Sequence, residues 1–250
     1  MSLLERLFKR QKNYPVEYID GDQDVPAKLY WQGESPVFWL PPGMLTWHGT
    51  QRFVANHPLV QAITQGEHAL ERYYAEFRPA NLAQMHSVVE TGLQGENLPP
   101  WCLPWCAWAE QRPPSAEAGL DAEHGVSYYG PCSSQKVTVE YQRMCSVMDS
   151  IVAKGYQPAR NGHIEGYFMR SGAQFRFFVQ GGKHRAAALV ALGFERIPVR
   201  IRQTWPRVIA AGSEKDWPMV RDGQVAPELA QRVLARYFQD DIEAPNDGLI

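Results

Sequence analysis

Five consecutive residues, Gly181-Gly182-Lys183-His184-Arg185, join two glycines to three basic side chains where a helix is expected to begin. Glycine accepts positive φ and lets the backbone approach a ligand closely. The first amides of a helix lack partners within it, and the helix dipole adds partial positive charge there, so this turn suits a phosphate. Three basic residues oppose the dipole unless an anion neutralises them. The alternative is a solvated basic turn in which Arg185 pairs with a surface carboxylate.

Phosphoryl transfer also requires a base for the attacking hydroxyl. Glu140 is the first candidate, because it lies on the polar side of the helix expected over residues 137–154. The alternative for Glu140 is an exposed ion pair with Arg143. Glu165 is a second candidate for the base, because it lies in a predicted strand and its side chain could face the site. The alternative is that its side chain points outward. His184 is assigned a catalytic role as well as a binding role.

Other residues are expected near the phosphate site. His124 is a candidate wall of the nucleotide pocket, with a structural role as its alternative. Lys136 could reach a phosphate, although a solvated lysine is favoured. The irregular segment 93–135 is too long for a simple connection and too aromatic for disorder, so we expect it to wrap the C-terminal part and to wall the pocket. Its tryptophans could stack on a base or sugar, but core packing is favoured: Trp101, Trp105 and Trp108.

Periodic apolar residues predict the elements that position these side chains. The helix over 137–154 has Ser133 or Ser134 as its N-cap, and Gly155 closes it. A hairpin turning at Ser171-Gly172 follows. The remaining predictions are strands at 163–169, 174–179 and 197–201 and helices at 183–192 and 227–238.

The N-terminal half has weaker patterns. Val37–Leu40 reads as a strand between prolines, and helices are expected from Pro58 to Gly66, around 70–77 and over 82–89. Residues 1–12 predict a short amphipathic helix that packs on its own domain. The alternative for this helix is contact with a membrane surface or a partner.

Composition limits the classes of function. The net charge of −2 and pI of about 6.4 argue against a surface built to hold nucleic acid. No apolar run is long enough for a membrane span, and no signal sequence is evident, so a cytoplasmic location is expected. Cys102 and Cys106 lack a second pair of ligands, so burial is favoured over zinc and no metal ligand is assigned. The sequence leaves the oligomeric state open.

The segment 125–205 resembles the core of the ParB/sulfiredoxin superfamily. The matching pieces occur in the family's order: Ser150-Ile151 to Gly155, Ile164-Glu165-Gly166, Gly182 to Arg185, and Ala187 to Val199. The resemblance implies an α+β fold, a small mixed sheet flanked by helices. We expect residues 121–250 to form this nucleotide-binding core with a C-terminal helix. Residues 1–120 are expected to pack on it as an N-terminal α/β extension of mixed helices and short strands.

Differences between this sequence and the family's motifs argue against some of the family's known functions. Sulfiredoxins have a catalytic cysteine where this chain has Lys183, and the helix-turn-helix domain of chromosome-partitioning ParB proteins finds no counterpart after residue 205. In free-serine kinases of the superfamily an aspartate stands where Gly181 stands here. The arrangement also resembles uncharacterised ParB-like proteins associated with surface-polysaccharide biosynthesis.

These observations favour a nucleotide-dependent phosphotransferase or NTPase. The expected cofactors are ATP, or another nucleoside triphosphate, and Mg²⁺. The expected acceptor is a small hydroxyl compound such as a sugar or an amino acid. A regulatory or adaptor module that binds nucleotide without turnover, in a polysaccharide pathway, is the first alternative. A DNA-binding ParB-like protein is the second.

Overall fold

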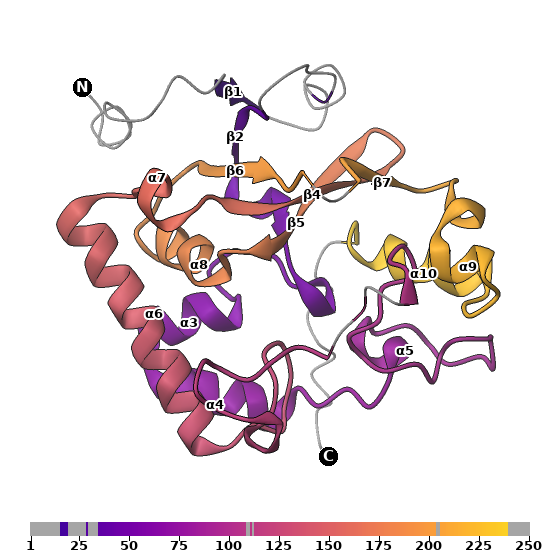
Figure 1. Cartoon of the computed structure of the whole chain (residues 1–250), viewed down its shortest axis with the longest axis horizontal. Coiled ribbons are helices and arrows are strands. Elements are labelled where there is room, and N and C mark those ends of the chain that lie inside the picture. Colours follow the sequence, from indigo (N-terminus) through magenta and orange to yellow (C-terminus); the bar gives the residue numbers. More distant parts are fainter. Residues whose placement is uncertain are drawn as a thin grey trace, which may run out of the picture.

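A mixed β-sheet runs through the computed structural model and has helices packed against it (Figure 1). The structure describes residues 16–19, 29, 35–108, 111, 113–203 and 206–239. Within these residues the sheet has seven strands in the order β1-β2-β6-β4-β5-β3, with β7 also paired to β4. The strands are β1 Val16–Tyr18, β2 Val37–Leu40, β3 Leu45–Thr46, β4 Ile164–Ser171, β5 Gln174–Gly181, β6 Ile197–Ile201 and β7 Val208–Ala210. The expected α+β class is confirmed at this level.

The sheet draws strands from both halves of the sequence. β2 pairs antiparallel with β6, and β3 pairs parallel with β5. The hairpin of β4 and β5 turns at residues 172–173, one residue beyond the predicted turn at Ser171-Gly172. β4 also pairs in parallel with β6 and β7. N-terminal residues therefore build the same sheet that carries the Gly-Gly-Lys-His-Arg turn.

Two helices bring the candidate residues together. α6 (Ser134–Lys154) begins where the Ser133 side chain accepts a hydrogen bond from the Lys136 amide, and it ends at Gly155 with φ of 74°. α8 (Lys183–Ala191) begins after Gly182, whose φ of 85° lies in the left-handed region. Both ends agree with the sequence pattern. α8 packs on β4 and β6, and α6 packs on α8.

The remaining helices surround this pair and the opposite side of the sheet. α3 packs on α8, and α4 packs on α6. The α5 helix is shorter than its predicted range of 82–89. The helices are α3 Pro58–Gln65, α4 Glu67–Glu76, α5 Leu82–Met85, α7 Pro158–Asn161, α9 Pro218–Arg221 and α10 Pro227–Arg236, with 3₁₀ turns at Pro42–Met44, His48–Thr50, Ala122–His124 and Glu214–Asp216.

Alternating residues of the hairpin divide the core into two clusters. Phe168 and Phe177 pack with α3, α6 and α8, whereas Tyr167 and Phe178 pack with residues from 82–106 and from α9 and α10. This alternation is what opposite faces of a sheet produce. In the second cluster Trp105 is 3% exposed and Trp101 packs against it partly buried, so core packing is confirmed for these two, whereas Trp108 is 47% exposed. All four cysteines are unpaired.

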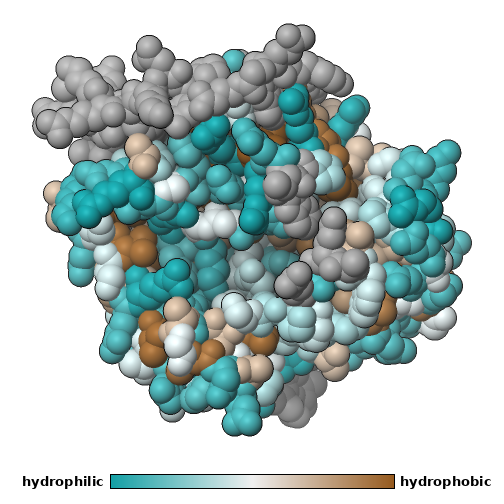
Figure 2. Space-filling model, in the orientation of Figure 1, coloured by the Kyte–Doolittle hydropathy of each residue, from teal (hydrophilic) through white to brown (hydrophobic). Residues whose placement is uncertain are grey.

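The predicted amphipathic helix at residues 1–12 lies outside the described residues. In the part of the chain that the structure describes, every helix is too short or too polar to cross a bilayer. The face in Figure 2 is mostly hydrophilic, with hydrophobic atoms in small separate areas.

Candidate functional site

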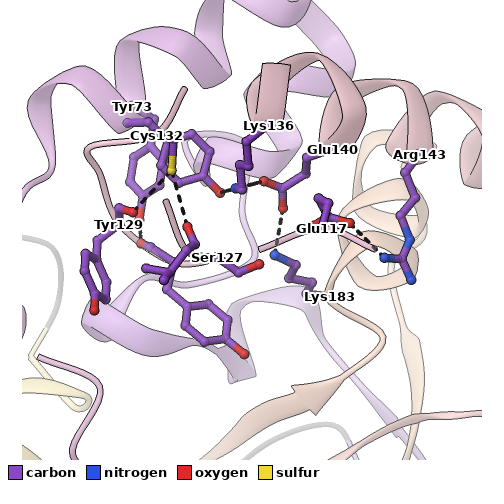
Figure 3. A network of polar contacts seen from close by, with 12 residues as sticks. Tyr73, Glu117, Ser127, Tyr129, Cys132, Lys136, Glu140, Arg143 and Lys183 are labelled. Carbon is purple, nitrogen blue, oxygen red and sulfur yellow. Dashed lines mark hydrogen bonds and ion pairs between the residues drawn. The ribbon is translucent and has the colours of Figure 1, made fainter. Parts of the chain in front are cut away.

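A buried carboxylate joins α4, α6 and α8. Glu140 is fully buried, and its two oxygens accept four hydrogen bonds. Oε1 accepts from Lys183 Nζ at 2.7 Å and from His184 Nε2 at 3.0 Å. Oε2 accepts from the Tyr74 hydroxyl at 2.7 Å and from Lys136 Nζ. A carboxylate offers about four lone-pair positions, so the described residues already use those of Glu140. Figure 3 shows Glu140 between Lys136 and Lys183.

The charges of this network favour an ionised Glu140. Burial alone would raise the pKa of Glu140, but Lys183, His184 and Lys136 outweigh burial and hold the pKa well below its usual value. Burial lowers the pKa of Lys136, and the charge of Glu140 opposes that shift. One carboxylate thus faces two lysine side chains, and the network carries an excess of positive charge that favours an anion beside it.

The network also determines the tautomer of His184. Burial lowers the pKa of His184, so its ring is neutral near pH 7. Because the ionised Glu140 accepts from Nε2, that nitrogen carries the hydrogen and Nδ1 keeps the lone pair. Nδ1 makes no hydrogen bond to the residues that the structure describes. The arrangement is that of an imidazole oriented by a carboxylate, in which the second nitrogen can accept a proton.

A cavity of about 550 Å³ opens beside the start of α8. Its volume lies within the range of roughly 300–1,000 Å³ that small-molecule sites occupy. Its wall combines three basic side chains, one carboxylate and many hydroxyl and amide groups: Ser115, Ala116, Glu117, Ser127, Tyr128, Arg143, Ser146, Val147, Ser150, Ile151, Tyr156, Gln157, Asn161, Gln180, Gly182, Lys183, His184 and Arg185. The expectation that the irregular segment walls the pocket is confirmed for its residues 115–117 and 127–128.

Glu117 is the carboxylate of this wall. It is 4% exposed, and Arg143 Nη1 on α6 donates to its Oε2 at 2.8 Å. The Arg143 side chain is 58% exposed, so much of its guanidinium remains open to solvent. With Lys183 and Arg185, three cations and one carboxylate line the cavity. The wall therefore has a net positive charge.

Arg185 has a second role in the fold. Its Nη1 donates to the backbone carbonyls of Asn161 and Gly162, at the C-terminal end of α7. Its guanidinium also lies close to Gly182, where a Cβ would be 2.9 Å from Nη2 and 3.2 Å from Ile164 Cα. Gly182 is therefore required both by its positive φ and by this close packing.

Besides the buried Glu140, three predicted site residues are absent from the cavity wall: Gly181, Glu165 and His124. Glu165 is half-buried in β4 opposite Gly181, and neither residue lines the cavity. His124 Nδ1 bonds the Ser133 hydroxyl at 2.9 Å, at the N-cap of α6, and is also absent from the wall.

The structure corrects two expectations about α6. Lys136 was expected to be solvated, but its side chain is fully buried against Glu140 and the Tyr74 ring. Arg143 pairs with Glu117, where the sequence suggested an exposed pair with Glu140. Both errors came from treating polar residues of an amphipathic helix as solvent-facing.

Sequence reasoning missed Glu117 and Tyr74. Glu117 lies in an irregular segment whose path has no periodic signal. Tyr74 fits the apolar stripe of α4, so its hydroxyl had no evident partner. A single clue was present: Lys136 and Glu140 stand four residues apart, the spacing of an ion pair on one helix.

Glu117, Glu140 and His184 also bring one possible metal-binding atom each within 4.8 Å of one another. The donor set fits a divalent ion poorly as it stands. Glu140 already accepts from two lysines, so an ion would have to displace an ammonium group before it could bind there.

Comparison of the chain with protein-family models, with curated proteins and with solved structures gives no match. The assignment of a function therefore depends on the geometry of this site.

Proposed function

We propose that the protein binds a nucleoside triphosphate, ATP by preference, in the cavity beside α8 and transfers its terminal phosphoryl group to a small hydroxyl compound such as a sugar or an amino acid. The observation that carries this proposal is His184. Its Nε2 is held by an ionised buried carboxylate, its Nδ1 keeps a lone pair, and its ring lines a cavity with net positive charge.

The phosphates would be held by three features of the wall. The α8 N-terminus offers backbone amides that lack partners within the helix. Lys183 contributes its ammonium group, and Arg143 contributes a largely exposed guanidinium. The serine hydroxyls and amides along α6 and α7 suit the hydroxyl groups of a ribose or of a sugar acceptor.

His184 would act as the base. Its Nδ1 would accept the proton of the acceptor hydroxyl, and the imidazolium would then be stabilised by Glu140. Glu140 itself would orient the ring, because its oxygens are already bonded and it has no exposed surface. Glu165 has no place in this scheme.

ATP would supply the phosphoryl group. Glu140 would not hold the expected Mg²⁺, because each of its oxygens already accepts a hydrogen bond from a lysine ammonium group.

Nucleotide binding is measured first, by calorimetry with ATP, ADP, CTP and GTP, each with and without magnesium. Arg143→Gln should weaken binding by about tenfold, the effect of one lost charge-assisted hydrogen bond. Arg221→Gln is the matched control, because Arg221 is also an exposed arginine in an ion pair, with Asp222, but on α9. Binding that neither variant changes, or no binding at all, contradicts the proposed site.

Turnover is measured next, with a panel of sugars and amino acids as acceptors. His184→Gln keeps a donor toward Glu140 but removes the base. Transfer should fall by roughly 100-fold or more while nucleotide affinity changes little. Equal turnover in wild type and variant would exclude His184 as the base.

A nucleotide-binding adaptor without chemistry is the second candidate. It is favoured because two cations of the motif already form hydrogen bonds within the protein. Lys183 donates to Glu140, and Arg185 donates to two backbone carbonyls. Tight nucleotide binding with no transfer to any acceptor and no hydrolysis would decide for it.

A further inference from the structure

A second cavity, of about 500 Å³, lies between α3, α4 and the segment that follows β3. Its wall consists of Gln51, Arg52, Asn56, His57, Pro58, Gln61, Ala69, Arg72, Tyr73, Glu76 and Phe77. None of these residues belongs to the cavity beside α8. The second cavity is large enough for a small organic ligand.

Two buried polar atoms in this wall have no partner among the described residues: His57 Nε2 and Gln51 Oε1. Buried polar atoms without a partner are rare and point to a missing water or ligand. Among the described residues of the first cavity's wall, one side-chain atom, Gln180 Oε1, is also buried without a hydrogen-bond partner.

The chemistry of both atoms follows from their neighbours. His57 Nδ1 accepts a hydrogen bond from the Leu59 amide at 3.2 Å, so Nε2 carries the hydrogen and is a donor. The Tyr73 hydroxyl donates to the Tyr128 carbonyl and accepts from Gln51 Nε2, which determines the orientation of the Gln51 amide. Gln51 Oε1 is therefore an acceptor. The residues of the wall thus contain one buried donor and one buried acceptor without a partner among the described residues.

Charge and aromatic surface complete the wall. Arg72 is exposed on α4 and forms no ion pair with any described residue. Arg52 Nη2 donates to the Gln239 carbonyl at 3.2 Å, and the exposed Glu76 supplies the one carboxylate. Among the described residues, the wall holds two arginines and one glutamate, and Arg72 is the arginine that remains exposed to solvent. The rings of Tyr73 and Phe77 are stacked, 5.5 Å between centroids and 21° between planes, and offer a flat apolar surface.

We propose that this second cavity binds a small organic anion that carries a planar ring and a hydrogen-bond donor, such as a hydroxylated aromatic carboxylate. Arg72 pairs with the carboxylate, and the rings of Tyr73 and Phe77 contact the ligand ring. Gln51 Oε1 accepts from the ligand donor, and His57 Nε2 donates to a ligand oxygen. The site stands apart from the proposed transfer reaction and does not depend on it.

A chain of hydrogen bonds connects the wall of the second cavity to the wall of the first. The Gln51 amide that contacts the ligand also holds the Tyr73 hydroxyl, and that hydroxyl holds the carbonyl of Tyr128. Tyr128 lines the first cavity and has a φ of 99°, so its position depends on these contacts. Occupation of the second cavity is therefore expected to stabilise the wall of the first.

The test uses 4-hydroxybenzoate as the probe and 4-hydroxybenzamide as its uncharged counterpart, both titrated by calorimetry into the whole protein. The carboxylate should bind, and the amide should bind at least about tenfold more weakly, the effect of a lost charge-assisted contact. Arg72→Gln should weaken the binding of 4-hydroxybenzoate by a similar factor. Glu76→Gln should strengthen its binding, because the one negative charge among the described residues of the wall is removed.

Arg143→Gln, in the wall of the first cavity, should leave the binding of the probe unchanged. The ¹⁵N signal of His57 Nε2 should shift at saturation, which a contact at the rim alone would not produce. Absence of saturable binding overturns the proposal. So does binding that Arg143→Gln weakens and Arg72→Gln does not, because the probe would then occupy the first cavity.

Discussion

The two faces of the sheet bury polar groups in different ways. On the first, here called the network face, α6 and α8 enclose Glu140 with Lys136, Lys183, His184 and Tyr74. On the second, called the aromatic face, the centre pairs neutral groups. There Trp105 Nε1 donates to the Tyr167 hydroxyl at 2.7 Å, and His86 Nε2 bonds the Tyr237 hydroxyl at 3.0 Å.

We propose that the network face is the one shaped by function. Buried ion pairs seldom stabilise a fold more than apolar packing of the same volume would, because the charges lose their hydration. The centre of the aromatic face packs through neutral ring contacts such as Tyr167 with Phe178, whose centroids are 5.1 Å apart. Its buried charged residues form no ion pair with each other in the described part of the chain: Glu96 accepts from backbone amides, and Arg176 lies over the Phe238 ring. The network face therefore retains its charges beside a cavity for a reason other than stability, and ligand binding is that reason in our proposal.

The largest effect is expected from Glu140→Gln, because it leaves the buried Lys136 without its carboxylate. Breaking a buried pair in this way costs roughly 3–5 kcal/mol. Urea denaturation at pH 7 should show this loss, and Glu71→Gln, at an exposed position of α4, should cost little.

The double variant Lys136→Met/Glu140→Leu removes both charges and should recover much of the loss. A cost for Glu140→Gln below about 1 kcal/mol would mean that the network is not held by charge, and the contrast between the faces would fail.

Acidification should affect both faces alike. Burial lowers the pKa of His57, beside the network face, to about 3 and that of His86, on the aromatic face, to about 4, from 6.5. Their stabilisation is complete above pH 6.5 and is lost as the pH falls toward the folded values, because the unfolded chain binds these protons first. Each histidine should contribute about 1.4 kcal/mol per pH unit within that window.

Urea midpoints measured between pH 7 and pH 5 test this dependence. His57→Gln and His86→Gln should each flatten it, whereas His68→Gln, at an exposed position, should not. Flattening by one variant alone would show that a single face is responsible for the acid sensitivity.

The sequence predicted the elements of the fold better than their contacts. Periodic residues and caps placed α6, α8 and the β4–β5 hairpin to within a few residues, because each is specified by local chemistry: Ser133 and Gly155 at the ends of α6, and Gly182 before α8. The range of α5 was too long, since the chain leaves the helix before Ser87, which has a φ of 51°.

The site was harder to predict because its contacts join distant segments. The sequence selected the turn from Gly181 to Arg185 and also Glu140, but nothing local indicated that Tyr74 would reach Glu140 across 66 residues. Burial of Lys136 is equally a consequence of α4 packing on α6. Glu117 reaches the cavity only through the path of an irregular segment.

The smallest effect is expected on the aromatic face, from Tyr167→Phe. The variant keeps the ring but leaves the buried Trp105 N–H without its acceptor, which should cost about 1–3 kcal/mol. Tyr129→Phe is the matched control, because Tyr129 is 8% exposed and its hydroxyl bonds none of the described residues. Neither this loss nor the loss at Glu140 should change much with salt, because both contacts are buried. A loss at Tyr167 equal to the loss at Glu140, with both variants measured by urea denaturation at pH 7, would remove the distinction between the faces.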